Sequence, residues 1–391
     1  MVRRPRTVED MVTGPDTGFW RGRRVLLTGH TGFKGAWLAL WLHRLGARVT
    51  GVSLAPATTP NLFTLANVAQ CLDHHVVDIR DAGALATVVR QAQPEVVMHL
   101  AAQALVRTSY DAPASTFATN CLGTVHLLDA LRGLAGVRVV LVATTDKVYR
   151  NREDGRAFVE TDELGGHDPY SASKAAAEIA IASYRDAFLR QAGVAVASVR
   201  AGNVVGGGDW SFDRLLPDAV RAWGAALPLE VRRPDAVRPW QHVLQPLHAY
   251  LRLVECLWHR PSLASAYNIG PDAAQCAPVR AVLQLAQRAY GAGEVRYAEQ
   301  ALGVHEAGVL MLDSSKIRAV IGQQVGWSLA QSVVRTVAWY RSLQGGENAA
   351  RLCAQDINAF EAMDLAPTSE LRGLRRGATS GAPHTSSGTV R

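Results

Sequence analysis

Three glycines, each three residues after the last, follow a short apolar run near the amino end of the chain. The run covers residues 25–27, and Gly29, Gly32 and Gly35 lead into a stretch at 36–45 with apolar residues at helical spacing. In such a strand–turn–helix unit, the first glycine permits the tight turn and the second lets the backbone approach a pyrophosphate. The third lets the helix pack closely on the strand. Three glycines alone are a weak signal, but this setting predicts a dinucleotide-binding turn.

Short β-branched apolar runs alternate with helical patterns over the first half of the chain. The runs that we interpret as strands are 25–27, 48–52, 75–78, 96–100, 137–143 and 194–199. The helical patterns cover 36–45, 83–92, 113–133 and 169–191. Alternation of this kind places parallel strands in one sheet and helices on both of its faces. We therefore expect an α/β chain with a Rossmann-type, doubly wound parallel sheet.

This rhythm ends after Arg200, where three glycines at 206–208 and several prolines make the chain rich in loops. A smaller, mixed α/β substrate lobe is expected there, mostly helical over 277–362, with a short strand at 310–312. The last residues are rich in Gly, Ser, Thr and Pro, which is typical of disorder. The expected division is a flexible extension at 1–18, a dinucleotide-binding domain at 19–200 plus about 241–258, a substrate lobe at 201–240 plus about 259–362, and a disordered tail at 363–391.

Composition narrows the class of protein. The 391 residues include 41 basic and 34 acidic side chains, and the net charge of +7 suits an anionic ligand. The arginines are scattered, which argues against nucleic acid as a partner. None of the five cysteines pairs as CxxC, so we expect neither a metal site nor a disulfide framework. With no signal peptide and no apolar run of membrane-spanning length, a cytoplasmic protein that does not enter the membrane is expected.

Lysine is rare in this chain. Only Lys34, Lys147, Lys174 and Lys316 stand among the 41 basic residues, and the rest are arginine. Arginine does not give up its proton in proteins, whereas lysine does when its surroundings lower its pKa. Two of the four lysines fall in polar clusters after the fifth predicted strand, which suggests that they take part in chemistry. For Lys34 and Lys316, chance retention remains as plausible.

Tyr170 and Lys174 are four residues apart in a helical stretch, so their side chains share one face. A lysine ammonium near a phenol favours the phenolate. Tyr170 would then act as a base that takes a hydroxyl proton while hydride leaves the same carbon. The YxxxK spacing is common by chance, and its place after the fifth strand is what makes it informative.

Thr145, Asp146 and Lys147 stand where the fifth predicted strand ends. Open parallel sheets bind ligands beyond the carboxyl ends of their strands. Thr145 is placed to hydrogen-bond a sugar hydroxyl, and Asp146 and Lys147 are a carboxylate and an amine side by side. Hydride exchange alone needs neither, but elimination of water from a keto sugar needs an acid and a base. A surface ion pair at a strand end is the simpler alternative.

The residue that usually binds the adenosine ribose is missing. Residues 53–55, after the second strand, are Ser-Leu-Ala, with neither an acidic residue nor an arginine for a 2′-phosphate. The choice between NAD and NADP therefore stays open at this point. Asp78 and Ile79, after the third strand, are candidates to bracket the adenine, although Asp78 also fits a solvated strand end.

Several motifs together resemble the extended branch of the short-chain dehydrogenase/reductase family over roughly residues 20–362. They are GHTGFKG at 29–35, HLAAQ at 99–103, TDK at 145–147, DPYS at 168–171, RAGNVVGGGDW at 200–210, RPWQHV at 238–243 and HEA at 305–307. Within that branch the match is to the CDP-glucose 4,6-dehydratases. The GGGDW and RPWQHV stretches and Lys147 separate this group from dTDP-glucose dehydratases, which carry Glu at that position. The Asp-Lys pair separates it from the 4-epimerases.

The resemblance implies a redox-neutral conversion of CDP-D-glucose to CDP-4-dehydro-6-deoxy-D-glucose and water, with NAD as cofactor. Tyr170 would deprotonate the 4-hydroxyl as the C4 hydride leaves. Water would then be lost across C5 and C6, with Asp146 as acid and Lys147 or its surroundings as base, before hydride returns to C6. A nucleotide-sugar 4-epimerase or reductase of the same fold is the alternative.

The resemblance also implies a set of site residues and an oligomeric state. The catalytic set is Thr145, Asp146, Lys147, Tyr170 and Lys174. The cofactor set is Gly29, Thr31, Gly32, Phe33, Gly35, Asp78, Ile79, Leu100, Ala101, Ala102, Tyr170 and Lys174, and the substrate set is Gln103, Asn203, Arg214, Arg238 and Asn268. Asn120 is expected either to support the site through water or to be a buried structural amide. Residues 154–158 depart from the family's aromatic-rich pattern. A homodimer or homotetramer through the helices near 113–133 and 170–191 is expected.

Overall fold

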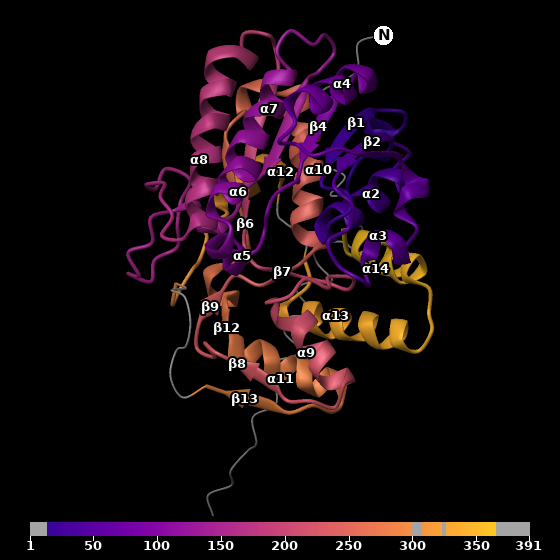
Figure 1. The fold of residues 1–391 in the computed structure, drawn as a ribbon, viewed down its shortest axis with the longest axis vertical. Coiled ribbons are helices and arrows are strands. Elements are labelled where there is room, and N and C mark those ends of the chain that lie inside the picture. Colours follow the sequence, from indigo (N-terminus) through magenta and orange to yellow (C-terminus); the bar gives the residue numbers. More distant parts are fainter. Residues whose placement is uncertain (1–13, 299–306, 323–325, 365–391) are drawn as a thin grey trace, which may run out of the picture.

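A parallel sheet of seven strands lies at the centre of the molecule (Figure 1), which a computed structural model describes for residues 14–298, 307–322 and 326–364. The strand order is β11-β6-β5-β4-β1-β2-β3. The strands are β1 (Arg24–Thr28), β2 (Arg48–Ser53), β3 (Asp73–Val76), β4 (Val96–His99), β5 (Val139–Ala143), β6 (Ala195–Ala201) and β11 (Ala266–Ile269). The chain reverses direction across the sheet beside β1, and that switch point is where open α/β sheets bind ligands.

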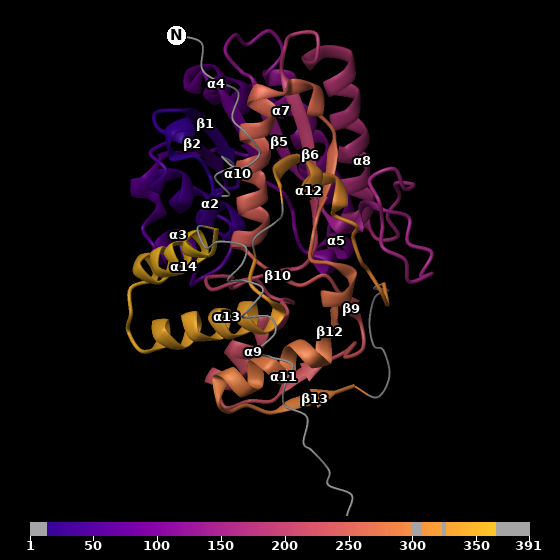
Figure 2. The same cartoon turned by 180° about the vertical axis from the view of Figure 1, so that it is seen from behind.

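Helices cover both faces of this sheet, as Figures 1 and 2 show from opposite sides. One layer contains α2 (Phe33–Arg44), α10 (Leu244–His259) and α14 (Ala349–Asp364); the other contains α4 (Ala82–Ala92), α7 (Gly123–Ala130) and α8 (Pro169–Tyr184). Because successive strand residues point to opposite faces, Val25 and Leu27 join the first core and Leu26 the second. Burial on both faces explains why these strands are continuous apolar runs.

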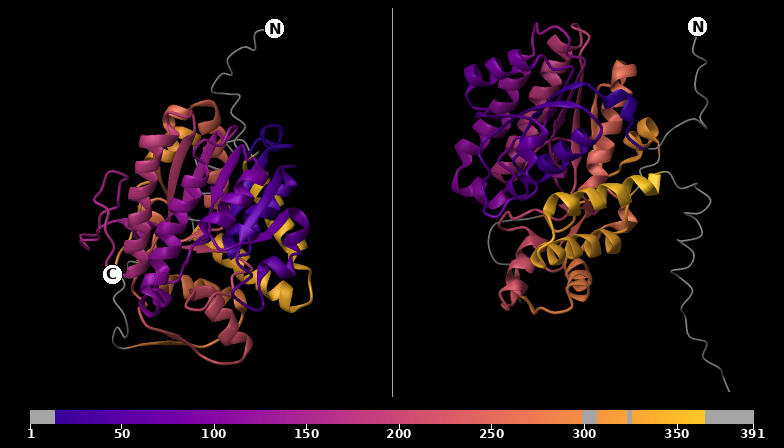
Figure 3. Two further views of the ribbon diagram at one scale, coloured as in Figure 1. Left: turned by 45° about the horizontal axis from the view of Figure 1, so that its top comes forward. Right: turned by 90° about the vertical axis from the view of Figure 1, so that its right-hand side faces the viewer.

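A smaller lobe lies beyond the carboxyl ends of the strands (Figure 3). Its core is a third apolar cluster, separate from the two that cover the sheet. Its helices are α9 (Leu215–Gly224), α11 (Val279–Tyr290) and α13 (Leu329–Gln344). Its strand pairs are β7 (Val204–Val205) with β10 (Gln241–His242), β8 (Leu229–Val231) with β13 (Val295–Tyr297), and β9 (Val237–Arg238) with β12 (Ala277–Pro278).

Short elements complete the described chain. They are α1 (Thr17–Trp20), α3 (Leu62–Leu65), η2 (Val68–Cys71), α5 (Val106–Asp111), α6 (Pro113–Phe117), the π-helical η3 (Ala118–Leu122), η4 (Asp146–Val148), the π-helical η5 (Arg185–Leu189), η6 (Pro261–Leu263), η7 (Ala273–Gln275) and α12 (Ser315–Ile321). No helix among the described residues combines the length and apolar character that crossing a membrane requires.

The predicted fold class is confirmed, and three details of the prediction are wrong. The third strand begins at Asp73, two residues before the predicted range. Residues 266–269, assigned from the sequence to the lobe, form the seventh strand of the large sheet. Residues 310–312 form no strand, and Leu312 alone among them makes an isolated bridge, with Phe158. Four-residue strands carry too little periodicity to locate from sequence, and pairing with a distant strand decides them.

The two ends of the described chain pack on the large domain. Trp20 Nε1 donates to Glu255 Oε1 at 2.8 Å, and Trp41 Nε1 donates to Glu361 Oε1 at 2.9 Å. Helix α1 therefore begins inside the expected extension. Helix α14 packs near α2, although residues 349–362 were expected in the lobe and residues 363–364 in the disordered tail. The remaining boundaries between the dinucleotide-binding domain and the lobe, near residues 200, 241 and 258, stay predictions. Residues 1–13 and 365–391, and with them most of both expected terminal extensions, lie outside the described residues.

Candidate active site

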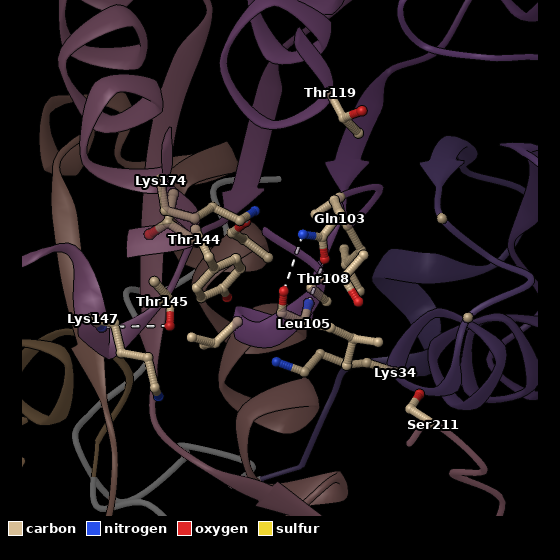
Figure 4. Close-up of a pocket in the computed structure, with 18 of the residues that line it drawn as sticks. Lys34, Gln103, Leu105, Thr108, Thr119, Thr144, Thr145, Lys147, Lys174 and Ser211 are labelled. Atoms are coloured by element: carbon tan, nitrogen blue, oxygen red, sulfur yellow. Dashed lines mark hydrogen bonds between the residues drawn. The ribbon is translucent and has the colours of Figure 1, made fainter. Parts of the chain in front are cut away.

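One cavity of about 860 Å³ opens between the carboxyl ends of the sheet strands and the lobe. Figure 4 shows some of its lining side chains, which include Lys34 on α2, Gln103 after β4, Thr144, Thr145 and Lys147 after β5, and Lys174 on α8. The residues predicted from sequence that line it are Gly29, Thr31, Gly32, Phe33, Gly35, Asp78, Ile79, Leu100, Ala101, Ala102, Gln103, Thr145, Asp146, Lys147, Tyr170, Lys174, Asn203, Arg214 and Arg238. Asn268 does not line it.

The glycine turn fits a dinucleotide phosphate. Gly29 has a φ of 78°, and its N–H donates to Val52 O at 2.8 Å. A Cβ on Gly35 would lie 2.1 Å from Gly29 O, so no other residue fits there without moving the helix. Gly32 is the N-cap of α2 and supplies no side-chain acceptor to the first amides of the helix. An uncapped helix N-terminus beside such a turn is a ready anion site.

The rim where an adenosine would lie is polar but carries no acidic ribose ligand at the end of β2. Ser53 Oγ lies 2.7 Å from Thr31 Oγ1, so the two hydroxyls pair with each other. Asp78 is bound by Arg80, with Arg80 Nη2 at 2.6 Å from Asp78 Oδ2, and hydrogen bonds from Arg80 lower the pKa of Asp78. Arg80 also lines the cavity and was missed from the sequence.

Asp146 and Lys147 contact each other at the end of β5. Lys147 Nζ donates to Asp146 Oδ1 at 2.8 Å, and Thr145 Oγ1 donates to the same oxygen at 3.0 Å. Asp146 Oδ2 is buried with no hydrogen-bond partner within the described part of the chain. Asn203 Oδ1 lies 3.4 Å from Lys147 Nζ. The Asp146 side chain is 0% exposed, so this contact is not the surface ion pair that was the simpler alternative.

The helix that carries Tyr170 and Lys174 starts where its sequence says it should. Asp168 is the N-cap of α8 and accepts from Ser171 N at 2.9 Å, and Pro169 occupies the first helical position. Tyr170 therefore sits in the first turn, with Lys174 one turn later on the same face. Lys174 Nζ donates to Ala143 O at 3.2 Å, which brings the amine to the end of β5.

The charge state of these groups differs in part from expectation. Burial raises the pKa of Tyr170, while a hydrogen bond with Thr145 and the charge of Arg214 lower it. The net shift of the Tyr170 pKa is upward, where a lowering by Lys174 was expected, and the Lys174 amine donates to the Ala143 carbonyl. Burial lowers the pKa of Lys174 itself to about 8, against the opposing charge of Glu178. A lysine with that pKa exchanges protons near neutral pH.

Lys34 is a further cation in the cavity. It lies on the first turn of α2, and Figure 4 shows its side chain extending into the cavity. Its Nζ lies 3.4 Å from Tyr250 Oη. Burial, together with the nearby charges of Arg214 and Lys174, lowers its pKa to about 8. The scarcity of lysine was the signal for this residue, although the sequence left chance retention equally open.

The predicted substrate arginines line the cavity, each anchored to backbone. Arg214 Nη2 donates to Ala104 O at 3.0 Å, and its buried Nε has no partner among the described residues. Arg238 donates to Gly308 O at 3.3 Å and to Ala307 O at 2.5 Å. Three further lining residues, missed from the sequence, form an ionic group at the cavity wall: Arg107, Asp213 and Arg232.

Two predicted amides hold the backbone near the site. Gln103 lines the cavity, but its Nε2 donates to Leu105 O at 3.0 Å, as Figure 4 shows. Asn120 Nδ2 donates to Gln103 O at 3.0 Å and to Ser173 Oγ at 2.9 Å. Asn120 therefore matches the alternative of a buried structural amide.

Asn268 is the predicted site residue that the structure places elsewhere. It is 0% exposed, and its Oδ1 accepts from Tyr149 Oη at 2.6 Å. Its Nδ2 donates to Phe158 O at 2.8 Å and to Asp313 O at 3.2 Å. As part of β11, Asn268 faces these buried groups, so its direct contact with a substrate was the wrong expectation. Residues 305 and 306 of the HEA motif lie outside the described residues.

The described residues hold no group of three or more His, Cys, Asp or Glu side chains suited to a metal ion. The cavity is lined instead by amines, guanidiniums and hydroxyls, together with the carboxylates of Asp78, Asp146, Asp168, Asp209 and Asp213. Such a set suits an anionic organic ligand.

Comparison with known proteins places this chain among nucleotide-sugar enzymes. The CDP-glucose 4,6-dehydratase of Salmonella typhimurium is 38% identical over 351 residues, which span 88% of this chain and 98% of that protein. A dTDP-glucose 4,6-dehydratase from Streptomyces venezuelae, solved with NAD and TYD bound, is 27% identical with a TM-score of 0.69, covering 84% of this chain and 99% of that one. The UDP-glucose 4-epimerase of Thermus thermophilus in complex with NAD is 28% identical with a TM-score of 0.70, covering 81% and 99%.

The family resemblance found in the motifs is thereby confirmed. The family model for GDP-mannose 4,6 dehydratase matches residues 26–336, which include the glycine turn, the Asp146–Lys147 pair and the helices α2 and α8. The chain belongs to the GDP-mannose 4,6 dehydratase family.

Proposed function

We propose that this protein is an NAD-dependent CDP-glucose 4,6-dehydratase that forms CDP-4-dehydro-6-deoxy-D-glucose and water. The observation that carries the proposal is the contact between Lys147 and Asp146, at 2.8 Å, in the cavity that also holds Tyr170 and the glycine turn. Hydride exchange alone needs only Tyr170 and a cofactor. An acid and a base in contact, beside them, supply what loss of water adds. The 38% identity to a CDP-glucose 4,6-dehydratase supports the choice of sugar nucleotide.

The cofactor would lie across the switch point of the sheet, with its pyrophosphate at Gly32 and the N-terminus of α2. NAD, when bound, would accept the C4 hydride and later deliver it to C6. Tyr170 would take the proton of the 4-hydroxyl, with Thr145 and Arg214 supporting the phenolate that burial disfavours. The buried Lys174, whose pKa is about 8, would supply positive charge beside the sugar.

The Asp146–Lys147 contact suggests how an acid and a base arise together. If the proton on Lys147 passes to Asp146 across 2.8 Å, the pair becomes a neutral amine and a neutral carboxylic acid. The amine can then take the proton from C5, and the acid can protonate the leaving 6-hydroxyl, so that one C–O and one C–H bond break while water and a C5–C6 double bond form.

Proton balance over the cycle points to a role for Thr145. As hydride reaches C6, Lys147 would return to C5 the proton that it took from there. Over the cycle Tyr170 therefore gains the 4-hydroxyl proton, whereas the departing water takes a proton from Asp146. Thr145 donates to Asp146 Oδ1 at 3.0 Å and hydrogen-bonds Tyr170, so it lies between the two. A hydroxyl in that place can return the proton and reset the site without bulk water.

The test is conversion of a set of nucleotide sugars by purified protein. CDP-glucose should give a 4-keto product, detected by its absorbance in alkali, with dTDP-glucose, UDP-glucose and GDP-mannose turned over far more slowly. Mass loss equal to one water would accompany the product, without net change in the cofactor. A product with an inverted C4 and an intact 6-hydroxyl would identify an epimerase, and net consumption of reduced nicotinamide would identify a reductase. Inactivity toward every nucleotide-glucose would refute the proposal.

Assembly into homodimers or homotetramers forms part of the proposal. Exposed apolar side chains gather on the packed elements α6, η3 and α8: Phe117 is 38% exposed, Leu122 53% and Ile179 62%. A face with several exposed apolar residues is typical of an interface. Light scattering should give a multiple of the 42.0 kDa chain mass. Ile179→Glu should yield monomers, and a wild-type monomer would contradict the proposal. A cytoplasmic location stays a prediction that cell fractionation would test.

A further inference from the structure

The reactive side chains Thr145, Asp146 and Lys147 stand on a segment with little regular structure. The segment, residues 144–149, follows the end of β5 and contains only the short turn η4. Figure 4 shows Thr144, Thr145 and Lys147 in succession along it. A single short turn fixes few backbone hydrogen bonds. The backbone of the segment is held near both ends, because Thr144 N donates to Val199 O at 2.9 Å and Gly165 N donates to Val148 O at 2.8 Å. Side-chain contacts at the same two ends add to this hold on Asp146 and Lys147.

Both ends of this segment contact one buried ion pair. Arg200 Nη2 donates to Glu178 Oε2 at 2.8 Å, and the two side chains are 5% and 3% exposed. At the first end, Thr144 Oγ1 donates to Glu178 Oε1 at 2.5 Å. At the second end, Arg200 Nη1 donates to Tyr149 Oη at 2.9 Å, and its guanidinium lies 5.0 Å from the centre of the Tyr149 ring.

The pair itself is fixed by the sheet and by α8. Glu178 lies on α8, one turn after Lys174, and Arg200 lies on β6. Ser198 Oγ, also on β6, donates to Glu178 Oε2 at 2.7 Å. Charge-assisted bonds in a buried setting are short and about twice as strong as neutral ones. The Glu178–Arg200 ion pair is thus a fixed contact point for both ends of residues 144–149.

We infer that Glu178 and Arg200 are positioning residues for the elimination step, because they fix residues 144–149 at both ends and so set Asp146 and Lys147 against the sugar. This inference rests on the proposed function of the cavity. A buried ion pair is weak evidence for stability, since apolar residues often replace one without loss. Its contacts with both ends of this particular segment favour a role in geometry.

The test removes hydroxyl groups at the ends of the segment and leaves the ion pair in place. Thr144→Val removes the contact at the first end. Tyr149→Phe removes the contact at the second end together with the hydrogen bond from Tyr149 Oη to Asn268 Oδ1, so Asn268→Ala, which loses that bond but keeps the contact between Tyr149 and Arg200, is measured beside it. Ser198→Ala is the matched control, because it removes a hydrogen bond to the same carboxylate from a residue outside the segment. Thr144→Ser keeps the hydroxyl and should therefore retain the wild-type rate of water loss. Glu178 is not substituted, because its charge also affects the pKa of Lys174.

The first measurement is a single turnover of CDP-glucose by the enzyme with its cofactor. In Thr144→Val and Tyr149→Phe, the oxidised sugar and reduced nicotinamide should accumulate, because loss of water slows by about tenfold while C4 oxidation changes little; a misplacement of about 1 Å costs up to about 100-fold. In Ser198→Ala and Thr144→Ser, the ratio of the rate of water loss to the rate of C4 oxidation should match that of the wild type. This should hold even where these variants lower the melting temperature as much as the two test variants do.

The second measurement does not depend on activity. Hydrogen–deuterium exchange of a peptide spanning 144–149 should quicken in Thr144→Val and Tyr149→Phe and stay at the wild-type rate in Ser198→Ala. Equal accumulation of reduced nicotinamide in the control, or unchanged exchange in both test variants, would overturn the inference. A wild type that dehydrates no nucleotide-glucose would instead refute the proposed function, and the exchange measurement would still decide whether the pair positions the segment.

Discussion

Lys147 Nζ lies 2.8 Å from Asp146 Oδ1, and the other carboxylate oxygen of Asp146 is buried with no hydrogen-bond partner within the described chain. Neighbours in sequence rarely face each other, but here the extended Thr145 and the turn η4 turn both side chains into one cavity. The side chain of Lys147 is 26% exposed and that of Asp146 is 0% exposed, so the carboxylate is shielded from solvent while the lysine side chain reaches the open part of the cavity. The predictions below follow from this contact and its surroundings.

Asp146→Asn should separate the two halves of the reaction. The amide keeps the shape of the carboxyl group but cannot deliver a proton to the leaving hydroxyl. C4 oxidation should proceed, loss of water should fall by about 10²- to 10⁴-fold, and reduced nicotinamide should build up on the enzyme. Rapid-scan absorbance of the enzyme mixed with CDP-glucose measures this. Turnover at the wild-type rate would show that another group is the acid.

Tyr170→Phe should stop the reaction one step earlier. Without the phenol, nothing removes the 4-hydroxyl proton as hydride departs, so no reduced nicotinamide should appear. Cofactor binding should change little, because the glycine turn is untouched. The same absorbance experiment and a calorimetric titration with NAD check both points. A burst of reduced nicotinamide in this variant would assign the base to a different residue.

Gly35→Ala should weaken cofactor binding. Its Cβ would lie 2.1 Å from Gly29 O, so α2 must move away from the turn. A forced shift of this kind costs about 1–3 kcal/mol of stability. Gly83→Ala is the control, since that Cβ would meet only Asp81 Oδ1 at 3.5 Å. Urea unfolding and NAD titration of both variants measure the effect, and equal affinities would contradict a tight turn.

The buried Lys174 should leave a signature in the pH dependence of stability. Its pKa is about 8 in the folded chain against 10.5 for the exposed group. Between those values the unfolded chain binds a proton that the folded chain does not, so the free energy of unfolding rises with pH. Wild type should gain up to about 3 kcal/mol relative to Lys174→Met as the pH rises through this window. Urea unfolding at a series of pH values measures this. If the free energies of unfolding of the two proteins change in parallel with pH, the lowered pKa of Lys174 is excluded.

Asn268→Ala should lower stability and leave substrate affinity nearly unchanged. Its side chain bonds Tyr149, Phe158 and Asp313 in a fully buried setting, and each lost buried bond costs about 1 kcal/mol or more. Asn203→Ala is the contrast, because Asn203 lines the cavity beside Lys147. Asn203→Ala should raise the KM for CDP-glucose at a near-native melting temperature. If Asn268→Ala raises the KM and Asn203→Ala does not, Asn268 would have to be assigned to substrate binding after all.

The sequence by itself determined the features that depend on short spacing. Gly29, Gly32 and Gly35 predict the turn by their spacing. An added Cβ would lie 2.6 Å from Ala101 N at Gly29 and 2.1 Å from Gly29 O at Gly35, so only a residue without a side chain fits at those two positions. Asp168 and Pro169 predict the start of the helix that carries Tyr170 and Lys174, and the end of a buried strand predicts where Asp146 and Lys147 lie. These are relations between residues a few positions apart, which local backbone geometry fixes before any tertiary packing.

Only the tertiary structure decided the features that depend on distant partners. Asn268 bonds Tyr149 across 119 positions, and that contact takes it out of the cavity and into the buried seventh strand. Glu178 meets Arg200 across 22 positions, and Lys34 reaches Tyr250 across 216. The direction of a side chain and the desolvation of its charge are set by whichever elements pack around it. No local pattern in the sequence records which elements those are.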